Sequence, residues 1–599
     1  MSMMDFLKSF RGNLRLRPAK QDISLLLFAV GIGLLAAVGA LLFRTLIEVM
    51  HMAFWPQGTS FMDQIRAAPW WQILLIPTLG GLVAGPVITF LVPEARGPGV
   101  PEVILAVTTR QSTIRHRVTF LKGLITSLLL ACGASVGREG PIVQIGSSVG
   151  SSVAQLFNLT PELRRLCLAC GAAAGISATF NAPITGAVFA MEIILLNIEV
   201  SYISHLVIAS ITGSVLSRIF WGNFPAFRVI NFELENYFQI FGYLLLGLLA
   251  GLVSILFVRA IYATESIFTR LPLPQWLCPA LGGLLLGGLA LQIPQVMGVG
   301  YDTVNSALDG TLVLNLALLL LIGKVAATSI CIGSGMSGGI FAPSLYLGAA
   351  LGTALGHVLS LIWPGLDLHP AFFALAGMGA VVSGTTLAPI TAIVTIFELT
   401  LHPQIILPLM VSCISATLVV RLLFGVSAYE MKLLRRGINI VRGHDVGILR
   451  DLCVSDVMRH TVPKLSIKAS LADIVQEIST GPYPHFVVED DNHQLAGVLS
   501  PRDVRESFLY FEDLKESVIA ADLMTTNVVT VTSRDNMETA LHLFEDHPFS
   551  MFPVVDNDNH VVGILTKDDL LKAYDQKVLK DRILSAQPET KPSGKSCRR

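Results

Sequence analysis

The chain has 599 residues, which is too many for one compact domain. Charged residues make up only 14% of it, hydrophobic residues make up 52%, and the mean hydropathy is +0.64. A soluble domain typically carries about 25% charged residues, so most of this chain faces lipid or buried protein. The net charge of -1 gives no electrostatic reason to expect a nucleic-acid partner.

The first part of the chain is a series of apolar stretches. Residues 1–20 are basic and longer than the leader of a signal peptide, so we expect a cytoplasmic segment there. Ile23 to Leu42 is long enough to cross a bilayer. Further apolar stretches lie at 72–92, 119–133, 204–220, 238–261, 275–292, 311–332, 340–362, 370–382 and 403–424. Several are short or interrupted by Gly and Pro, which predicts an all-α polytopic membrane domain over 21–437 with broken and re-entrant helices.

The basic residues indicate how this domain is oriented. Outside residues 1–20 they cluster at Arg110, Arg115, Arg117 and Lys122, at Arg164 and Arg165, and at Lys432, Arg435 and Arg436. The positive-inside rule then predicts that both ends of the domain are cytoplasmic. Short loops, and no organelle-targeting segment, favour a bacterial inner membrane.

A long-range repeat runs through the membrane region. FNAPITGAVFAMEI at 180–193 resembles TLAPITAIVTIFEL at 386–399, and CGASVGREGPIV at 132–143 resembles SGMSGGIFAPSL at 334–345. Two such halves predict a duplicated transporter fold, in an inverted-repeat arrangement, with its binding site where the halves meet. The sequence does not itself show the inversion.

The composition changes near residue 430, and a second repeat follows at a constant offset of 66 residues. Met458 matches Met524, Gly497 matches Gly563, and each unit reads as strand, turn, strand and helix. We therefore expect a soluble α/β pair after a linker at 438–450, with one module at 451–510 and the next at 517–578. The tail at 579–599 is expected to be disordered.

Cysteines give no sign of a metal site. Cys167 and Cys170 form a CxxC pattern, but it lies in an apolar run with no second pair at zinc spacing. We interpret both as small packing residues and predict no metal.

Three glycine-rich loops each end in proline and precede an apolar helix. They are Gly97–Pro101, Gly137–Pro141 and Gly339–Pro343. Proline suits a first helical turn, and glycine lets the backbone approach a ligand closely. A helix start presents unpaired N–H groups and a partial positive charge, so several converging starts would bind an anion weakly enough to release it.

These motifs resemble the chloride channel/transporter (CLC) family. The resemblance rests on GREGP followed by IVQIG, on GGIFAP, and on FNAP followed nine residues later by a glutamate, in the family's order, and it covers about residues 20–440. It implies a homodimer with one anion pathway in each subunit. It also implies that the repeated C-terminal units are regulatory CBS modules.

The resemblance assigns roles to individual residues. Glu139 would be the gate and proton acceptor, since an ionisable group at membrane depth is expensive to bury and functional by default. The anion site would comprise Pro98, Gly99, Arg138, Gly140, Ile340, Phe341 and Tyr429. Lys122 and Glu192 would tune it. Glu192 is alternatively a structural residue facing buried backbone donors, like its repeat mate Glu398.

Two departures from the family pattern leave alternatives open. Pro98 replaces the serine common in the first loop, which associates the protein with nitrate as well as chloride. Ile193 occupies the position at which many proton-coupled members carry a second glutamate, and isoleucine cannot carry a proton. Anion/proton exchange is the favoured interpretation, and a passive voltage- or pH-gated chloride channel is the alternative.

The C-terminal pair suggests one further ligand. Ser500 with Asp503, and Thr566 with Asp569, match the Ser/Thr-x-x-Asp that binds adenine nucleotides in CBS modules. A helix N-cap explains each instance equally well. No other cofactor is expected.

Two functions of other classes fit less well. A CBS-bearing divalent-cation transporter would need several intramembrane carboxylates, and the candidates Glu139, Glu192 and Glu398 are too few and too dispersed. A membrane enzyme is not supported, because no HExxH or Walker A motif appears. We therefore expect membrane transport of chloride or nitrate, with protons as the coupled ion.

Overall fold

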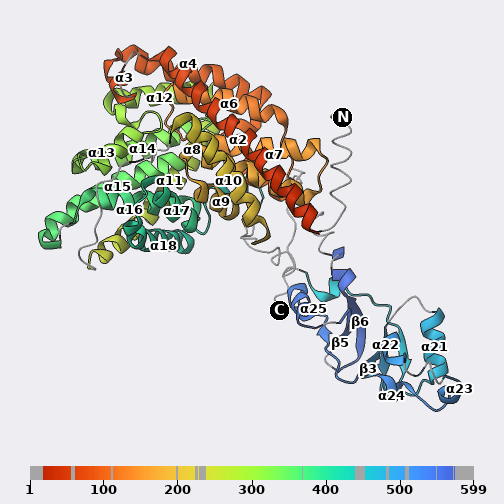
Figure 1. The fold of residues 1–599 in the computed structure, drawn as a ribbon. Helices are drawn as coiled ribbons and strands as arrows, with labels where there is room; N and C mark the ends of the chain where they lie inside the picture. Colours follow the sequence, from red (N-terminus) through yellow and green to blue (C-terminus); the bar gives the residue numbers. More distant parts are fainter. Residues whose placement is uncertain are drawn as a thin grey trace. The chain divides into compact units, whose positions relative to one another are not determined.

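The computed structural model describes residues 18–55, 58, 61–109, 112–196, 200–222, 227, 238–366, 368–438, 452–480, 485–505, 507, 511–547, 549–556, 558–570 and 572–573. The chain divides into two compact units, Met1–Ile440 and Val441–Arg599, and each is described by itself (Figure 1). Nearly all of the expected N-terminal segment and linker, and the whole expected tail, lie outside the described residues.

The first half of the membrane unit runs to residue 221. Its helices are α2 (Pro18–Phe54), α3 (Phe61–Ala67), α4 (Trp70–Pro86), η1 (Val87–Leu91), η2 (Pro93–Ala95), α5 (Val100–Thr109), α6 (His116–Ala131), α7 (Glu139–Leu156), α8 (Pro161–Phe180), α9 (Pro183–Phe189), η3 (Ala190–Leu195) and α10 (Val200–Trp221).

The second half repeats this series. Its helices are α11 (Gln239–Arg270), α12 (Cys278–Gln292), η4 (Pro294–Val296), α13 (Tyr301–Leu308), α14 (Leu314–Gly333), α15 (Phe341–Ile362), η5 (Pro364–Leu366), α16 (Pro370–Thr386), α17 (Pro389–Thr400), η6 (Pro403–Ile405), α18 (Ile406–Leu423) and α19 (Ala428–Leu434). Within each half the same pairs pack together: α7 on α8 corresponds to α15 on α16, and α2 on α10 to α11 on α18.

Only some of these helices could cross a bilayer whole. Among the described residues, seven helical segments are long and apolar enough: Ser24–Phe54, Trp70–Leu91, Ser201–Trp221, Gln239–Arg270, Leu314–Gly333, Phe341–Ile362 and Pro403–Leu434. Shorter apolar helices lie at Pro183–Leu195, Cys278–Gln292, Pro370–Thr386 and Pro389–Thr400. The expected polytopic domain with broken helices is confirmed.

The breaks between helices have the same local cause in both halves. α8 ends at Asn181, with a φ of 57°, and α9 begins two residues later at Pro183. α16 ends at Leu387, with a φ of 54°, and α17 begins at Pro389. A left-handed residue stops the first helix and proline starts the second. Leucine tolerates this conformation less well than asparagine, so the surrounding fold must impose it.

Glycines bring the buried helices into close contact. A methyl group added at Gly146 of α7 would overlap the carbonyl oxygen of Gly171 in α8, and one added at Gly348 of α15 would overlap that of Gly377 in α16. Lipid is as apolar as a helix surface, so membrane helices depend on this close backbone packing for their association.

The halves contact each other through two glutamates. Glu192, in η3, accepts hydrogen bonds from the backbone N–H groups of Ile390 (3.3 Å) and Thr391 (2.7 Å) at the start of α17. Glu398, near the end of α17, accepts hydrogen bonds from the backbone N–H groups of Ile184 (2.9 Å) and Thr185 (2.6 Å), near the start of α9. The start of the α9–η3 segment therefore meets the end of α17, and the start of α17 meets the end of the α9–η3 segment. They lie antiparallel, and the second half is inverted relative to the first.

The C-terminal unit contains two three-stranded sheets. The first sheet has the order β1 (Lys464–Ser466), β2 (Phe486–Glu489), β3 (Leu495–Leu499), and the second has β4 (Val531–Thr532), β5 (Met551–Val555), β6 (Val561–Thr566). In each sheet the first pair is parallel and the second antiparallel. The helices of the unit are η7 (Val454–Asp456), α21 (Leu471–Thr480), α22 (Pro501–Val504), α23 (Phe511–Leu514), α24 (Ala520–Leu523) and α25 (Met537–Asp546).

The repeated Met segments are exchanged between the two sheets. Arg459, which follows Met458, exchanges two backbone hydrogen bonds with Ile564 of β6, at 2.9 and 3.0 Å. Thr525 exchanges two with Val498 of β3, at 2.9 and 3.1 Å. Each sheet is thus completed by the segment that precedes the other sheet in the sequence, and the two modules depend on each other for a complete core.

Candidate anion-binding site

The three glycine-rich loops meet in the structure. The backbone N–H of Gly97 donates to the carbonyl oxygen of Met336 at 3.2 Å. Gly137 and Gly339 exchange two backbone hydrogen bonds, at 2.7 and 2.6 Å. Because these loops lead directly into α5, α7 and α15, the starts of three helices converge at one place.

Glycine permits this convergence. Gly97 and Gly99 have φ angles of 76° and 87°, in the region that residues with a side chain rarely adopt. A methyl group added at Gly140 would overlap the carbonyl oxygen of Pro98. The first two loops are therefore in direct backbone contact, and any side chain at Gly140 would separate them.

Glu139 is buried at this junction. The residue is only 1% exposed. Its Oε1 accepts a hydrogen bond from the hydroxyl of Tyr301 at 3.0 Å. Its Oε2 is directed toward Gly137, beside the backbone N–H of Ala342 at the start of α15, and is buried with no hydrogen bond from a described residue. The carboxylate thus lies among the starts of α7 and α15.

The remaining residues of the expected site surround this point. Ile340 and Phe341 are 1% and 2% exposed at the start of α15, and the Phe341 ring packs on Phe180 at 5.8 Å and on Phe189 at 6.4 Å. Tyr429 is 2% exposed in the first turn of α19. Arg138 immediately precedes α7. Pro98, Gly99, Gly140 and the start of α15 are thus brought to Glu139, and Tyr429 is near enough to Glu139 to interact with its charge. Lys122 instead contacts the first loop, and Glu192 contacts the second half.

Lys122 holds the first loop from behind. It is fully buried in α6, and its Nζ donates to the carbonyl oxygens of Ala95 (2.7 Å) and Gly97 (3.3 Å). Lys324 of α14 does the same in the second half, where its Nζ donates to Val296 (3.1 Å) and Gly298 (2.8 Å). Each lysine thus donates hydrogen bonds to carbonyl oxygens of a turn, and these oxygens lie outside the hydrogen bonding of the helices.

Lys324 and Tyr301 are functional candidates that sequence reasoning missed. The signal was available: Lys122 and Lys324 are 202 residues apart, the same offset that separates Glu139 from Phe341. The sequence Gly298-Val299-Gly300 repeats the Gly-x-Gly of the first loop, with φ angles of 61° and 89° at its glycines. It is a fourth loop of the same kind, and Tyr301 begins the helix that follows it.

A network of charges anchors α19 to the first loop. Lys432 donates to the carbonyl oxygen of Arg96 at 2.7 Å and lies 3.6 Å from the Glu102 carboxylate of α5. Arg436 pairs with the same carboxylate at 2.6 Å. The helix that carries Tyr429 is therefore tied to the loop that carries Pro98.

In the C-terminal unit the Ser/Thr-x-x-Asp pairs form helix caps. Ser500 donates to the Asp503 carboxylate through its hydroxyl (2.7 Å) and backbone N–H (2.8 Å). Thr566 donates to Asp569 at 2.6 Å, and Arg459 donates to the other Asp569 oxygen at 2.7 and 3.0 Å. Burial opposes ionisation of Asp569, but these donors hold its pKa below the usual value. Both aspartates thus take part in a helix cap, and Asp569 in addition pairs with Arg459.

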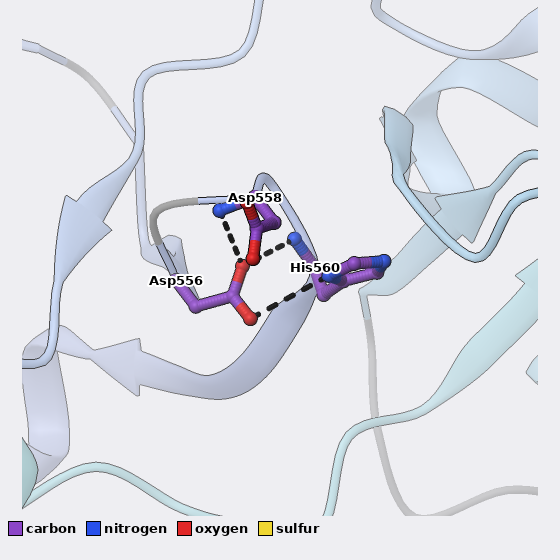
Figure 2. A group of neighbouring side chains, drawn as sticks. All are labelled: Asp556, Asp558 and His560. Carbon is purple, nitrogen blue, oxygen red and sulfur yellow. Dashed lines mark hydrogen bonds and ion pairs between the residues drawn. The ribbon is translucent and has the colours of Figure 1, made fainter.

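A carboxylate–imidazole group lies in the β5–β6 hairpin. Asp556, Asp558 and His560 point toward one another there (Figure 2). The Asp556 Oδ1 accepts from the backbone N–H groups of Asp558 (3.0 Å) and His560 (2.8 Å), and the His560 bond lowers the pKa of Asp556. Asp490 accepts the equivalent two bonds in the β2–β3 hairpin, from the backbone N–H groups of Asn492 and Gln494. We interpret the group as turn chemistry shared by both modules.

Comparison with known proteins identifies the family. A family model described as voltage gated chloride channel matches residues 80–421, which is more than half of the chain. The chain belongs to the voltage-gated chloride channel (CLC) family. A CBS-domain model matches residues 454–510 and 520–576, so the C-terminal unit is a CBS pair.

Named relatives agree with this assignment. The chain is 30% identical to the chloride channel protein CLC-e of Arabidopsis thaliana over 90% of this chain and 74% of that protein. It is 37% identical to the H⁺/Cl⁻ exchange transporter ClcA of Yersinia pestis over 57% of this chain and 73% of that protein. A crystal structure of a slow cyanobacterial Cl⁻/H⁺ antiporter matches 70% of this chain and 98% of that one, with 27% identity and a TM-score of 0.64.

The structure also places the two residues at which the sequence departs from the expected motif pattern. Pro98 supplies neither a hydroxyl nor a backbone N–H at the junction of the loops. Ile193 is 2% exposed and belongs to the main apolar cluster of the membrane unit. Neither side chain can donate a proton or a hydrogen bond to a transported ion.

Proposed function

We propose that the protein carries chloride across the membrane in exchange for protons, through the site where α5, α7 and α15 begin. The observation that carries the proposal is the buried Glu139 carboxylate among converging helix starts. The names of the ClcA relative and of the cyanobacterial antiporter favour exchange over passive conduction.

The proposed mechanism uses competition between a carboxylate and an anion. Helix starts stabilise negative charge through unpaired N–H groups and the helix dipole, without a full positive charge that would trap the ion. Ionised Glu139 occupies the outer anion position and excludes the ion. Protonation removes its charge, the side chain leaves, and an anion takes its place, so each cycle can move a proton against an anion.

The other expected residues fill supporting roles. Backbone N–H groups of Gly99, Gly140, Ile340 and Phe341 line the anion path, and the hydroxyl of Tyr429 donates to an ion at its centre. Arg138 attracts anions toward the outer position, and Lys122 shapes the first loop by binding its carbonyl groups. These assignments are supported by the burial and convergence of the residues and by the resemblance to CLC proteins.

A passive chloride channel is the second candidate. The observation that favours it is Ile193, a buried apolar residue where many coupled relatives carry a carboxylate. Water can still relay protons past such a position, so exchange remains the primary proposal. Nitrate is a second candidate substrate, because Pro98 removes one donor that would favour chloride.

The cellular setting follows from the resemblance and the charge pattern. We take the functional unit to be a homodimer in a bacterial inner membrane, with both termini cytoplasmic. The CBS pair is its regulatory part, with an adenine nucleotide as the candidate ligand. The domain limits of 21–437, 451–510 and 517–578 belong to the same proposal.

Purified protein in liposomes tests the central claim. Under a chloride gradient and an opposing pH gradient, the wild-type reversal potential should depend on both ions, whereas Glu139→Gln should show the Nernst potential of chloride alone. Glu162→Gln is the matched control, because Glu162 is also in the first turn of a helix, α8, but is exposed. It should behave as wild type.

Two results of the liposome experiment would contradict this proposal. A wild-type potential that follows chloride alone would establish the passive channel instead. Proton coupling that survives in Glu139→Gln would remove Glu139 from the gate.

A further inference from the structure

Tyr301 contacts the proposed gate directly. It is the first residue of α13 and follows Gly300, whose φ of 89° turns the chain into the helix. Its hydroxyl donates to the Glu139 Oε1 at 3.0 Å, across 162 residues of sequence. No role for Tyr301 follows from the CLC motifs that identified the rest of the site.

The tyrosine ring is held in place by its neighbours. Phe227 packs edge-on against it, with ring centres 5.5 Å apart and planes at 86°. The guanidinium carbon of Arg138 lies 5.2 Å from the ring centre, within the range of a cation–π interaction. Two contacts from different parts of the chain therefore fix where the hydroxyl points.

Tyr301 also borders a cavity. This cavity, of about 250 Å³, has a largely apolar lining to which Arg44, Glu48, His51, Arg138, Tyr301 and Asp302 contribute charged and polar groups. Glu139 is not among its lining residues. Tyr301 thus touches the cavity and the carboxylate alike, and stands between them.

We propose that Tyr301 is a positioning residue that holds the ionised Glu139 carboxylate in the position that excludes anions. This inference rests on the proposed function, in which Glu139 is the gate. A hydrogen bond donated to a carboxylate stabilises its ionised form more than its protonated form. The tyrosine therefore favours the closed, ionised gate, and protonation weakens its grip at the moment when the side chain must leave.

Other charged and titratable groups lie around Tyr301 and Glu139, and all of them are unchanged in the Tyr301→Phe variant. They are Arg44, Glu48 and His51 from α2, Arg138 before α7, Asp302 from α13, Lys324 from α14 and Tyr429 from α19. Because Tyr301→Phe leaves all of them in place, a change in pH dependence reports the lost hydroxyl.

The test is the pH profile of chloride flux from liposomes containing the full-length protein. In Tyr301→Phe, the pH of half-maximal flux should move about one unit toward alkaline values, since losing a hydrogen bond to a charged group costs about tenfold in the equilibrium. Flux at neutral pH should rise. Tyr346→Phe is the matched control: its hydroxyl donates to the carbonyl oxygen of Gln295 at 3.3 Å, and its pH profile should stay unchanged.

A double variant separates this inference from the proposed function. Glu139→Ala should make flux independent of pH, and adding Tyr301→Phe should then change nothing. An unchanged pH profile in Tyr301→Phe, or a shift that persists without Glu139, would overturn the positioning role alone. If Glu139→Ala keeps a proton-coupled, pH-dependent flux, the proposed function itself is wrong.

Discussion

At the scale of single residues, Pro98 limits what the junction of the first two loops can offer to an ion, because it has neither a hydroxyl nor a backbone N–H. Its carbonyl oxygen is in contact with Gly140, so the residue lies at the junction of the first two loops. A proline there provides no donor, and the site depends on neighbouring backbone N–H groups. If the ion binds at this junction as proposed, an anion that needs fewer close donors is penalised less than chloride.

Pro98→Ser should shift selectivity toward chloride. The new hydroxyl adds one hydrogen bond to the bound ion, worth about 1 kcal/mol, which corresponds to roughly a fivefold change in the chloride-to-nitrate ratio. Reversal potentials with chloride on one side of the membrane and nitrate on the other measure the ratio. Pro101→Ser, three residues later in the first turn of α5, is the control. Equal shifts in both variants would assign the effect to loop flexibility.

At the scale of elements, two reciprocal glutamate contacts join the halves. Glu192 and Glu398 each occupy the start of the opposite helix, where the N–H groups have no partner within the helix itself. The resemblance offered two roles for Glu192, in tuning the site and in structure. Its hydrogen bonds are of the kind that a structural role needs, and its repeat mate makes the equivalent ones.

Glu192→Gln and Glu398→Gln should therefore behave alike. Each replaces a carboxylate that accepts from two backbone N–H groups by an amide that can accept through only one oxygen, so each should destabilise the protein by about 2 kcal/mol. Thermal unfolding in detergent measures this. The proton coupling of both variants should match wild type. Loss of coupling in Glu192→Gln alone would make Glu192 a proton carrier.

At the scale of the whole molecule, a ligand of the CBS pair that alters transport would show that the two units are coupled. The Asp569 carboxylate accepts hydrogen bonds from the Arg459 guanidinium, whereas the Asp503 carboxylate accepts them from Ser500 at the start of its own helix. Asp503 is therefore the more available carboxylate for the ribose hydroxyl groups of a nucleotide.

Adenosine triphosphate should bind the full-length protein and change its flux. Asp503→Asn should weaken binding about tenfold, because a charge-assisted hydrogen bond is lost. Asp491→Asn is the control, since Asp491 is exposed on the β2–β3 hairpin and pairs only with the exposed Lys468 among the described residues. Calorimetry measures binding, and liposome flux measures the response. Equal binding in both variants would reject Asp503 as a ligand.

Much of this architecture was predictable because its signals are local or periodic. Pro141 and Pro343 mark helix starts through the fixed φ of proline, and the glycines before them mark sharp turns. The two duplications are visible because their copies kept the same residues at near-constant offsets. Glu139 was recognisable as a candidate functional residue because an ionisable residue in apolar sequence is costly to bury.

The sequence by itself thus determined the membrane class, the duplicated halves, the CBS pair and most of the residues at the junction of the loops. Tertiary structure decided what cannot be read along the chain: the inversion of the halves, the exchange of Met segments between the sheets, and the hydrogen-bond partner of Glu139. Tyr301 and Glu139 are 162 residues apart, and the packing of α13 on α15 and α16 brings them together. Local pattern encodes where helices begin, whereas the contacts between their ends depend on how the whole domain packs.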